Sequence, residues 1–171
     1  MRLFIGIKTG CEAHLAALQD ALKKLGRGRF THPDNLHITL KFLGELTPGK
    51  VPGLCAAISE AGGEPFVLEI GGAHMFNRSG ILAADVSGET EKLAALAARL
   101  ETALEQRGIQ KEMRPFKAHI TLARDYQPGG SLRGIPQAGC SFTVDEVVLF
   151  ESRRENGRLV YMPLFTHKLK P

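Results

Sequence analysis

Leu36-His37-Ile38-Thr39-Leu40-Lys41-Phe42-Leu43 is the stretch that decides the fold of this chain. Its apolar and polar residues alternate with a period of two, which is typical of a β-strand with one buried face. The core-facing set would be Leu36, Ile38, Leu40 and Phe42, and the opposite set His37, Thr39 and Lys41. The stretch therefore predicts a strand that presents an imidazole and a hydroxyl on its outer face.

The tetrapeptide His-Ile-Thr-Leu occurs a second time, at positions 119–122. Residues 116–122 alternate in the same way, so His119 and Thr121 would share one face of a second strand. If the fold brings the two strands side by side, two imidazoles and two hydroxyls meet on one surface. The alternative is that each copy is only a good half-buried strand, with Ile and Leu in the core and His and Thr facing water.

The residues of the two copies suit the cleavage of a phosphodiester. Imidazole titrates near neutral pH, so one histidine can take a proton from the attacking nucleophile while the other protonates the leaving oxygen. Hydroxyls and a guanidinium can hold the non-bridging oxygens as charge shifts onto them. The candidate catalytic residues are therefore His37 and His119, and the candidate phosphate-binding residues are Thr39, Thr121 and Arg124.

Other chemistries find less support in the sequence. Neither copy contains a carboxylate or a cysteine, so the usual ligand set of zinc is incomplete and we expect no metal and no cofactor. No Gly-x-Ser-x-Gly elbow and no Gly-x-x-x-x-Gly-Lys-Ser/Thr loop occurs. The other four histidines, His14, His32, His74 and His167, lie in helix, turn, loop and terminal contexts that predict solvated side chains.

Helices and strands are mixed along the rest of the chain. Spacing and end signals predict three helices, which begin near Thr9, Thr47 and Glu89 and end near Gly26, Gly62 and Gly108. Strands are predicted over 2–7, 36–43, 66–70, 81–86, 116–122, 142–150 and 159–165. Short loops between strands favour antiparallel hairpins, so we expect an α+β fold rather than a doubly wound parallel sheet. A divergent two-lobed duplication is compatible with the two copies.

Composition narrows the class of protein. The 171 residues fit one domain or two small lobes, and the net charge of +4 is compatible with an anionic ligand. Cys11, Cys55 and Cys140 are odd in number and lack ligand spacing, which argues against a disulfide framework and favours a reducing compartment. No signal peptide or membrane span is evident. We therefore expect a cytoplasmic soluble protein.

The chain resembles the two-histidine (2H) phosphoesterase superfamily and, within it, the LigT-like RNA 2′,3′-cyclic phosphodiesterases, which were first described as 2′-5′ RNA ligases. The resemblance rests on residues 2–5, 35–45, 114–124 and 142–152, in that order. It implies a single bilobed domain over 1–171 with pseudo-two-fold symmetry. A central cleft would lie between antiparallel sheets, with one His-x-Thr strand from each lobe.

The resemblance also implies an activity, which is metal-independent opening of a terminal RNA 2′,3′-cyclic phosphate to a 2′-phosphomonoester. By position, His37 would be the general acid on the departing 3′ oxygen and His119 the general base that activates water. Thr39, Thr121 and Arg124 would bind the phosphate. RNA with a cyclic phosphate end would be the partner of a chain that we expect to be monomeric, and 2′-5′ ligation would be the reverse reaction.

Two departures from the family concern residues that would help to bind the substrate. Members often carry a tryptophan in the strand that here spans 81–86, whereas this chain has none, and the loop 71–80 is short. Two alternatives to RNA hydrolysis stay open. One is a related enzyme for another cyclic phosphate, such as a small cyclic nucleotide or a tRNA-splicing intermediate, and the other is an RNA-binding relative without catalysis.

Overall fold

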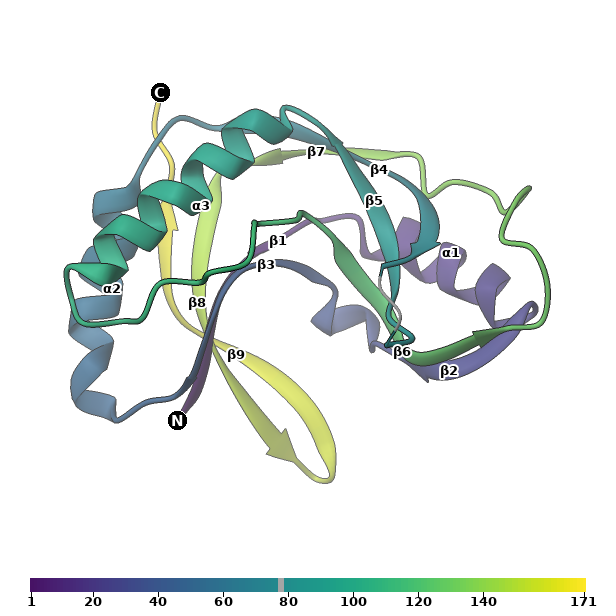
Figure 1. The fold of residues 1–171 in the computed structure, drawn as a ribbon, viewed down its shortest axis with the longest axis horizontal. Coiled ribbons are helices and arrows are strands. Elements are labelled where there is room, and N and C mark those ends of the chain that lie inside the picture. Colours follow the sequence, from purple (N-terminus) through teal and green to yellow (C-terminus); the bar gives the residue numbers. More distant parts are fainter. Residues whose placement is uncertain (77–78) are drawn as a thin grey trace.

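Nine strands form one curled antiparallel sheet in the residues described by the computed structural model, 1–76 and 79–171, and three α-helices flank it (Figure 1). The strand order is β7-β4-β5-β6-β3-β1-β8-β9, and β2 pairs with β6. One half of the sheet contains β1 (Arg2–Lys8), β3 (His37–Glu45), β8 (Glu146–Glu155) and β9 (Arg158–Lys168). The other half contains β2 (Gly26–Phe30), β4 (Phe66–Met75), β5 (Leu82–Gly88), β6 (Ile120–Pro128) and β7 (Cys140–Val144). The predicted α+β class is confirmed.

The two halves of the sheet meet between β3 and β6. The pairing recorded between these strands is the single antiparallel pair Ile38–Ile120, and both side chains are fully buried. The two strands therefore pair at the isoleucines of the two His-Ile-Thr-Leu copies, which meets the condition that the functional interpretation of the two copies requires.

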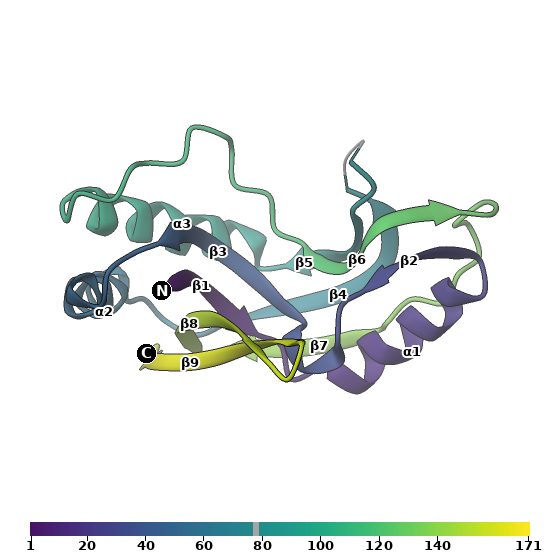
Figure 2. The same ribbon diagram turned by 90° about the horizontal axis from the view of Figure 1, so that it is seen from below.

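The helices cover the Ile/Leu side of the two motif strands. On one half, α1 (Glu12–Lys23) lies against β6. Two hydrogen bonds join them: the Gln19 side chain donates to the Leu122 carbonyl (3.0 Å), and the Tyr126 hydroxyl donates to the Leu22 carbonyl (2.8 Å). On the other half, α2 (Val51–Ala61) and α3 (Thr90–Glu105) pack on each other, and α3 contacts β3. Figure 2 shows α1 at the opposite end of the molecule from α2 and α3.

The predicted alternation over 36–43 is correct as far as Leu40 and wrong beyond it. Thr39 pairs with Gly6 and Lys41 with Ile5, so Leu40 is an extra residue in β3 and forms a bulge. A bulge exchanges the faces of the residues that follow it, here Lys41 and Phe42, until the next register shift at Leu43. Lys41 is consequently buried, 7% exposed, with Nζ 2.8 Å from Oε1 of Glu101, whereas Phe42 is 68% exposed.

Other element predictions also need correction. The strand β2 was not predicted, because two of its five residues are glycines and three are exposed. The predicted strand 142–150 is two strands, β7 and β8, which separate at Asp145 and belong to different halves of the sheet. The first helix begins at Glu12 rather than near Thr9, whose hydroxyl accepts from the Cys11 amide (3.1 Å). Asn77 and Arg78, within the predicted 71–80 loop, lie outside the described residues.

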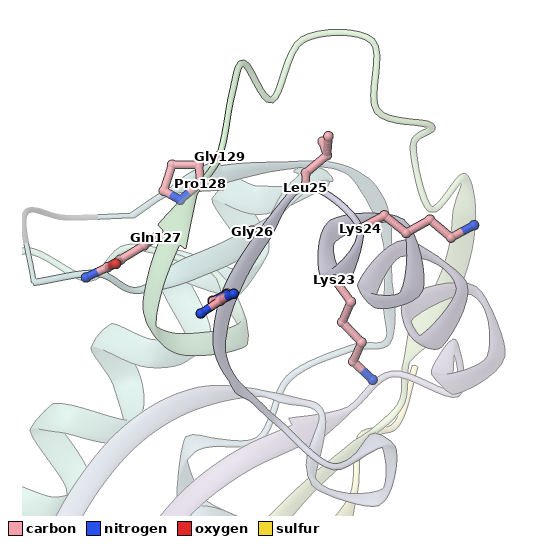
Figure 3. Close-up of a pocket in the computed structure, with 8 residues that line it drawn as sticks. Lys23, Lys24, Leu25, Gly26, Gln127, Pro128 and Gly129 are labelled. Atoms are coloured by element: carbon pink, nitrogen blue, oxygen red, sulfur yellow. The ribbon is translucent and has the colours of Figure 1, made fainter.

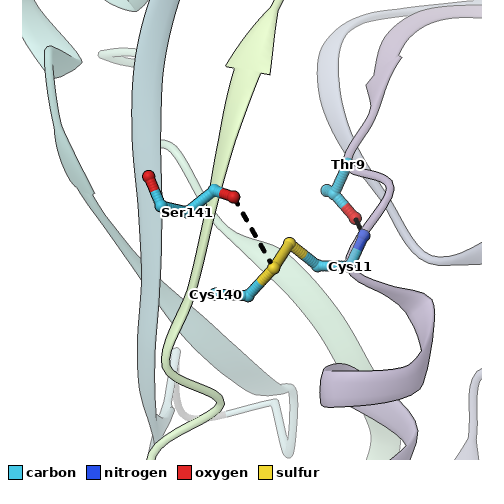
Figure 4. Close-up of a disulfide and its surroundings, with 4 residues drawn as sticks. All are labelled: Thr9, Cys11, Cys140 and Ser141. Atoms are coloured by element: carbon cyan, nitrogen blue, oxygen red, sulfur yellow. Dashed lines mark hydrogen bonds between the residues drawn. A yellow bond between two sulfur atoms is a disulfide. The ribbon is translucent and has the colours of Figure 1, made fainter.

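Two of the three cysteines form a disulfide, so the expectation of no disulfide was wrong. Cys11, directly before α1, is bonded to Cys140 at the start of β7, with the Cα atoms 6.2 Å apart (Figure 4). The partners are 129 positions apart in sequence, and only the fold brings them together. The cysteine count therefore does not support a reducing compartment. Within the described residues, no helix combines the length and hydropathy of a membrane span.

Candidate active site

The polar side chains of the two copies lie together on one side of the sheet. Because Ile38 pairs with Ile120 and points to the core, the residues before and after each isoleucine point to the opposite side. The antiparallel register runs His37 toward Thr121 and Thr39 toward His119, so each histidine faces the other strand's threonine. These four side chains are half-buried and are called here the His-x-Thr face.

The same hydrogen bond orients the imidazole in both copies. Nδ1 of His37 lies 2.6 Å from the carbonyl oxygen of Asn35, and Nδ1 of His119 lies 2.9 Å from that of Lys117. A carbonyl oxygen only accepts hydrogen bonds, so Nδ1 carries the proton in each ring. Both neutral histidines therefore present Nε2, with its lone pair, as the reactive nitrogen.

The two imidazoles differ in their surroundings. Nε2 of His37 lies 2.8 Å from Oγ1 of Thr39, and its ring is 4.8 Å from the ring of Phe4 and 5.3 Å from that of Tyr161. The ring of His119 is stacked on Phe76, with centroids 3.8 Å apart. Sequence reasoning missed Tyr161 and Phe76, because both come from strands and loops distant from the two motifs.

The pKa of each histidine is lowered from its ordinary value. For His37, burial is the main cause, and the positive charges of His119 and Arg124 add to it against the opposing hydrogen bond to Asn35. For His119, burial is again the main cause, His74 and Arg124 add to it, and the hydrogen bond to Lys117 opposes it. Both imidazoles are therefore mainly neutral at pH 7 in the unliganded protein.

Arg124 supplies a cation to this face. It lies on β6 three residues after Thr121, and its charge acts on His37, His119 and Tyr161. The neighbouring carboxylate of Asp125 is held by Arg29 of β2, whose Nη2 lies 2.6 Å from Oδ2. Arg124 has no ion-pair partner among the described residues. The structure thus brings together all five residues selected from the sequence.

His74 is a further histidine on the same side of the sheet. It pairs with Ala83 of β5, and Ala83 pairs with Thr121 of β6, so the three residues form a row across three strands. Nδ1 of His74 lies 2.5 Å from Oδ1 of Asp85. The prediction of a loop at His74 was wrong, because β4 extends through the glycines at 71 and 72 to Met75, although the side chain is 43% exposed, as predicted.

The chemistry available at the His-x-Thr face is proton transfer beside an anion-binding group. Two imidazoles and two hydroxyls share this face, the charge of Arg124 acts on both imidazoles, and the helices cover the opposite side of the two strands. Among the described residues, no group of three or more His, Cys, Asp or Glu side chains is placed to hold a metal ion. The arrangement suits acid–base catalysis on a negatively charged substrate.

Comparison with known proteins gives a family match over most of the chain. The profile of the family described as LigT like phosphoesterase matches residues 5–82 and 85–161. A protein of Escherichia coli named RNA 2′,3′-cyclic phosphodiesterase is 32% identical over 137 residues, which are 80% of this chain and 77% of that protein. A protein of Geobacillus stearothermophilus with the same name is 32% identical over 89% of this chain, which spans about half (52%) of that relative.

Solved structures give the same result for the fold. The crystal structure of E. coli LigT complexed with 3′-AMP superimposes with a TM-score of 0.86 at 29% sequence identity. The superposition covers 99% of this chain and 98% of that one. The curled sheet with its three helices is therefore the fold of a LigT phosphoesterase.

Proposed function

This chain belongs to the LigT like phosphoesterase family, and from that premise we propose that it is an enzyme that opens RNA ends carrying a 2′,3′-cyclic phosphate. One observation carries the proposal. The pair Ile38–Ile120 joins the two halves of the sheet, and its register leaves one histidine and one threonine from each half on the same face. The relatives named RNA 2′,3′-cyclic phosphodiesterase support the choice of substrate.

In the proposed reaction, a water molecule attacks the phosphorus of the cyclic phosphate. Nε2 of His119 accepts the proton of this water, and the bond between phosphorus and the 3′ oxygen breaks. Nε2–H of a protonated His37 donates its proton to the departing 3′ oxygen. The products are a 2′-phosphomonoester and a 3′-hydroxyl, and the two histidines return to their starting states by exchanging protons with solvent.

The remaining groups of the His-x-Thr face hold the phosphate in this proposal. In the unliganded protein the Thr39 hydroxyl lies 2.8 Å from Nε2 of His37. When His37 is protonated, that nitrogen no longer accepts, so the hydroxyl is available to donate to a phosphate oxygen. Thr121 makes the matching contact on the other strand. Arg124 holds the non-bridging oxygens, on which charge increases during attack.

Two features of the protein are part of the same proposal. All the groups needed for the proton transfers and for phosphate binding come from one chain, which supports a monomeric enzyme. They act without a metal ion, because Arg124 supplies the positive charge that a metal would otherwise bring to the phosphate. In 2′-5′ ligation, the 5′-hydroxyl of a second RNA would take the place of water: His119 accepts its proton, the 3′ oxygen leaves with the proton of His37, and a 2′-5′ phosphodiester forms.

The experiment that tests the proposal uses RNA that ends in a 2′,3′-cyclic phosphate, with chelator present. The wild type should turn it over, and His37→Ala or His119→Ala should each lower kcat by about 10²–10⁴-fold. The double variant should lose less than the product of the single losses, because the two groups act in one event. Full activity of the double variant would contradict the proposal.

A further inference from the structure

The strand β6 continues beyond Arg124 and ends at a separate hollow in the surface. This hollow has a volume of about 460 Å³ and is lined by residues 23–27 on one side and 127–129 on the other. Figure 3 shows that it lies where the end of α1 meets the start of β2 and the end of β6. It is distinct from the His-x-Thr face, and the proposed reaction does not use it.

The rim of the hollow carries positive charge. Of its eight lining residues, Lys23, Lys24 and Arg27 are basic and none is acidic. Lys23 has a long contact to Asp20, 3.8 Å, and lies 5.2 Å from the ring centroid of Phe30. Lys24 and Arg27 are exposed, and in the described part of the chain neither has an ion-pair partner. Two of these cations are therefore available to an anionic ligand.

At the other end of the sheet, two arginines are paired with carboxylates. On the β8–β9 hairpin, Nη2 of Arg153 lies 2.7 Å from Glu151, and Nη2 of Arg158 lies 3.0 Å from Asp34. Carboxylates already neutralise these two arginines. Arg154 of the same hairpin donates to the Gly157 carbonyl and has no ion-pair partner in the described part of the chain. A polyanion that leaves the His-x-Thr face thus meets two such cations, Lys24 and Arg27, on the β2–β6 side and one along this hairpin.

The two sides of the hollow approach each other closely through glycines. The amide of Gly129 donates to the carbonyl of Leu25 at 2.6 Å, and a Cβ at position 129 would lie 2.9 Å from that oxygen. A Cβ at position 26 would lie 2.7 Å from the Tyr126 ring. Glycine at both positions therefore allows this close approach. The side chains of Lys24 and Arg27 take no part in these contacts, so they can be changed without altering them.

The hollow is connected to the His-x-Thr face by one strand. Along the β2–β6 ladder, Arg29 pairs with Arg124, Arg27 with Gln127 and Gly26 with Pro128. At the usual rise of a strand, the seven positions from Thr121 to Pro128 span roughly 20 Å. A short single-stranded segment can bridge that distance.

We propose that this hollow binds the phosphodiester backbone of single-stranded RNA, a few nucleotides upstream of the cyclic phosphate end. The inference rests on the proposed function, because it assumes that the end of the RNA occupies the His-x-Thr face. Lys24 and Arg27 contact phosphates and no base edge is read, so binding is independent of sequence and weakened by salt. The hollow therefore makes the enzyme prefer longer RNA over a cyclic mononucleotide.

The test compares two substrates with the double variant Lys24→Ala, Arg27→Ala. One substrate is a nucleoside 2′,3′-cyclic phosphate, and the other is an RNA of about ten nucleotides with the same cyclic end. The variant should lose roughly three- to tenfold in kcat/KM on the RNA through KM, and less than twofold on the mononucleotide. The slope of log kcat/KM against log salt concentration on the RNA should become shallower by about 1.4.

A charge-matched control is the variant Lys50→Ala, Lys170→Ala. It also removes two exposed positive charges, but Lys50 precedes α2 and the Lys170 amide bonds to Gly63 just after α2, on the opposite half of the molecule. It should behave as the wild type on both substrates. An equal loss in this control, an equal loss on both substrates, or no length preference in the wild type would overturn the inference.

Failure of the proposed function can be told apart from failure of this inference. If the wild type hydrolyses neither substrate, equilibrium binding of the same RNA with a 2′-phosphate end still measures the hollow. Weaker and less salt-dependent binding by the Lys24→Ala, Arg27→Ala variant then supports an RNA-backbone site. Unchanged binding overturns it.

Discussion

The ring of Phe76 lies nearly parallel to the imidazole of His119, with the centroids 3.8 Å apart and the planes at 21°. Together with the hydrogen bond from Nδ1 to the Lys117 carbonyl, this contact holds the imidazole in one plane and directs Nε2. His37 is held in a similar way, by the Asn35 carbonyl and the rings of Phe4 and Tyr161. Each proposed proton-transfer group is thus fixed by one carbonyl and by aromatic packing.

Replacing Phe76 should impair the chemical step. A stacked aromatic pair contributes about 0.5–1.5 kcal/mol beyond its buried area, so Phe76→Leu should lower kcat up to roughly tenfold by loosening the His119 ring. Phe76→Tyr keeps the flat ring and should retain most of the activity. Steady-state kinetics of both variants provide the measurement, and equal activity of the leucine variant and the wild type would contradict the role given to this contact.

Replacing Arg124 should weaken the binding of the phosphate in the transition state. We expect Arg124→Ala to lower kcat/KM by about 10²–10³-fold, because it removes a charged donor from the site where negative charge develops. Arg124→Lys keeps the charge but not the planar fork, so it should recover part of this loss. A kcat/KM of the alanine variant within threefold of the wild type would contradict the assignment.

The lowered histidine pKa values predict where the activity is greatest. His119 must be neutral and His37 protonated, so kcat/KM rises through the pKa of His119 and falls above that of His37. Because burial lowers both values below 6.5, the optimum of kcat/KM should lie on the acid side of pH 6.5. An optimum of kcat/KM above pH 8 would contradict the lowered pKa values of the two histidines.

The charge of Arg124 offers a check on the same profile. It lowers the pKa of both histidines, so Arg124→Gln should move both limbs of the residual kcat/KM profile to higher pH. A profile that loses amplitude without moving would show that this charge does not act on the imidazoles.

The disulfide between Cys11 and Cys140 should stabilise the folded chain. It closes a loop of 129 positions, and removing such a link typically costs about 2–4 kcal/mol of unfolding free energy. Urea unfolding of the Cys11→Ser, Cys140→Ser variant measures this loss, with Cys55→Ser as the control that should unfold as the wild type does. Three titratable thiols in the denatured, unreduced protein would contradict the disulfide.

Much of the fold follows from local sequence patterns. The period-two alternation at 36–40 depends on a few neighbouring residues, and the structure has the predicted strand at that place. The leucine spacing before Gly108 is equally local, and the structure has the predicted helix. Four of the five candidate site residues were accessible to sequence analysis, because alternation within the two motifs places each histidine and its threonine on one face. Alternation alone would send Arg124 to the other face, and the register shift at Leu122 between β5 and β6 returns it to the face of Thr121.

The remaining features depend on partners that are distant in sequence. The exposure of Phe42 follows from a bulge that is defined only by the pairing of β3 with β1. The break at Asp145 arises because β7 pairs with β4 while β8 pairs with β1 and β9. The disulfide, Phe76 and His74 are likewise brought to their positions by β4, β5 and β7, and no local pattern records those contacts.

The most direct test of the account is the position of the phosphate after one turnover. RNA that ends in a 2′,3′-cyclic phosphate is incubated with the wild-type protein and a chelator, and the phosphate of the product is located. We predict a 2′-phosphomonoester with a free 3′-hydroxyl, because His37 protonates the departing 3′ oxygen while His119 activates water. A 3′-phosphate product would contradict the account, since a different oxygen would then leave and the roles of the two histidines would have to change.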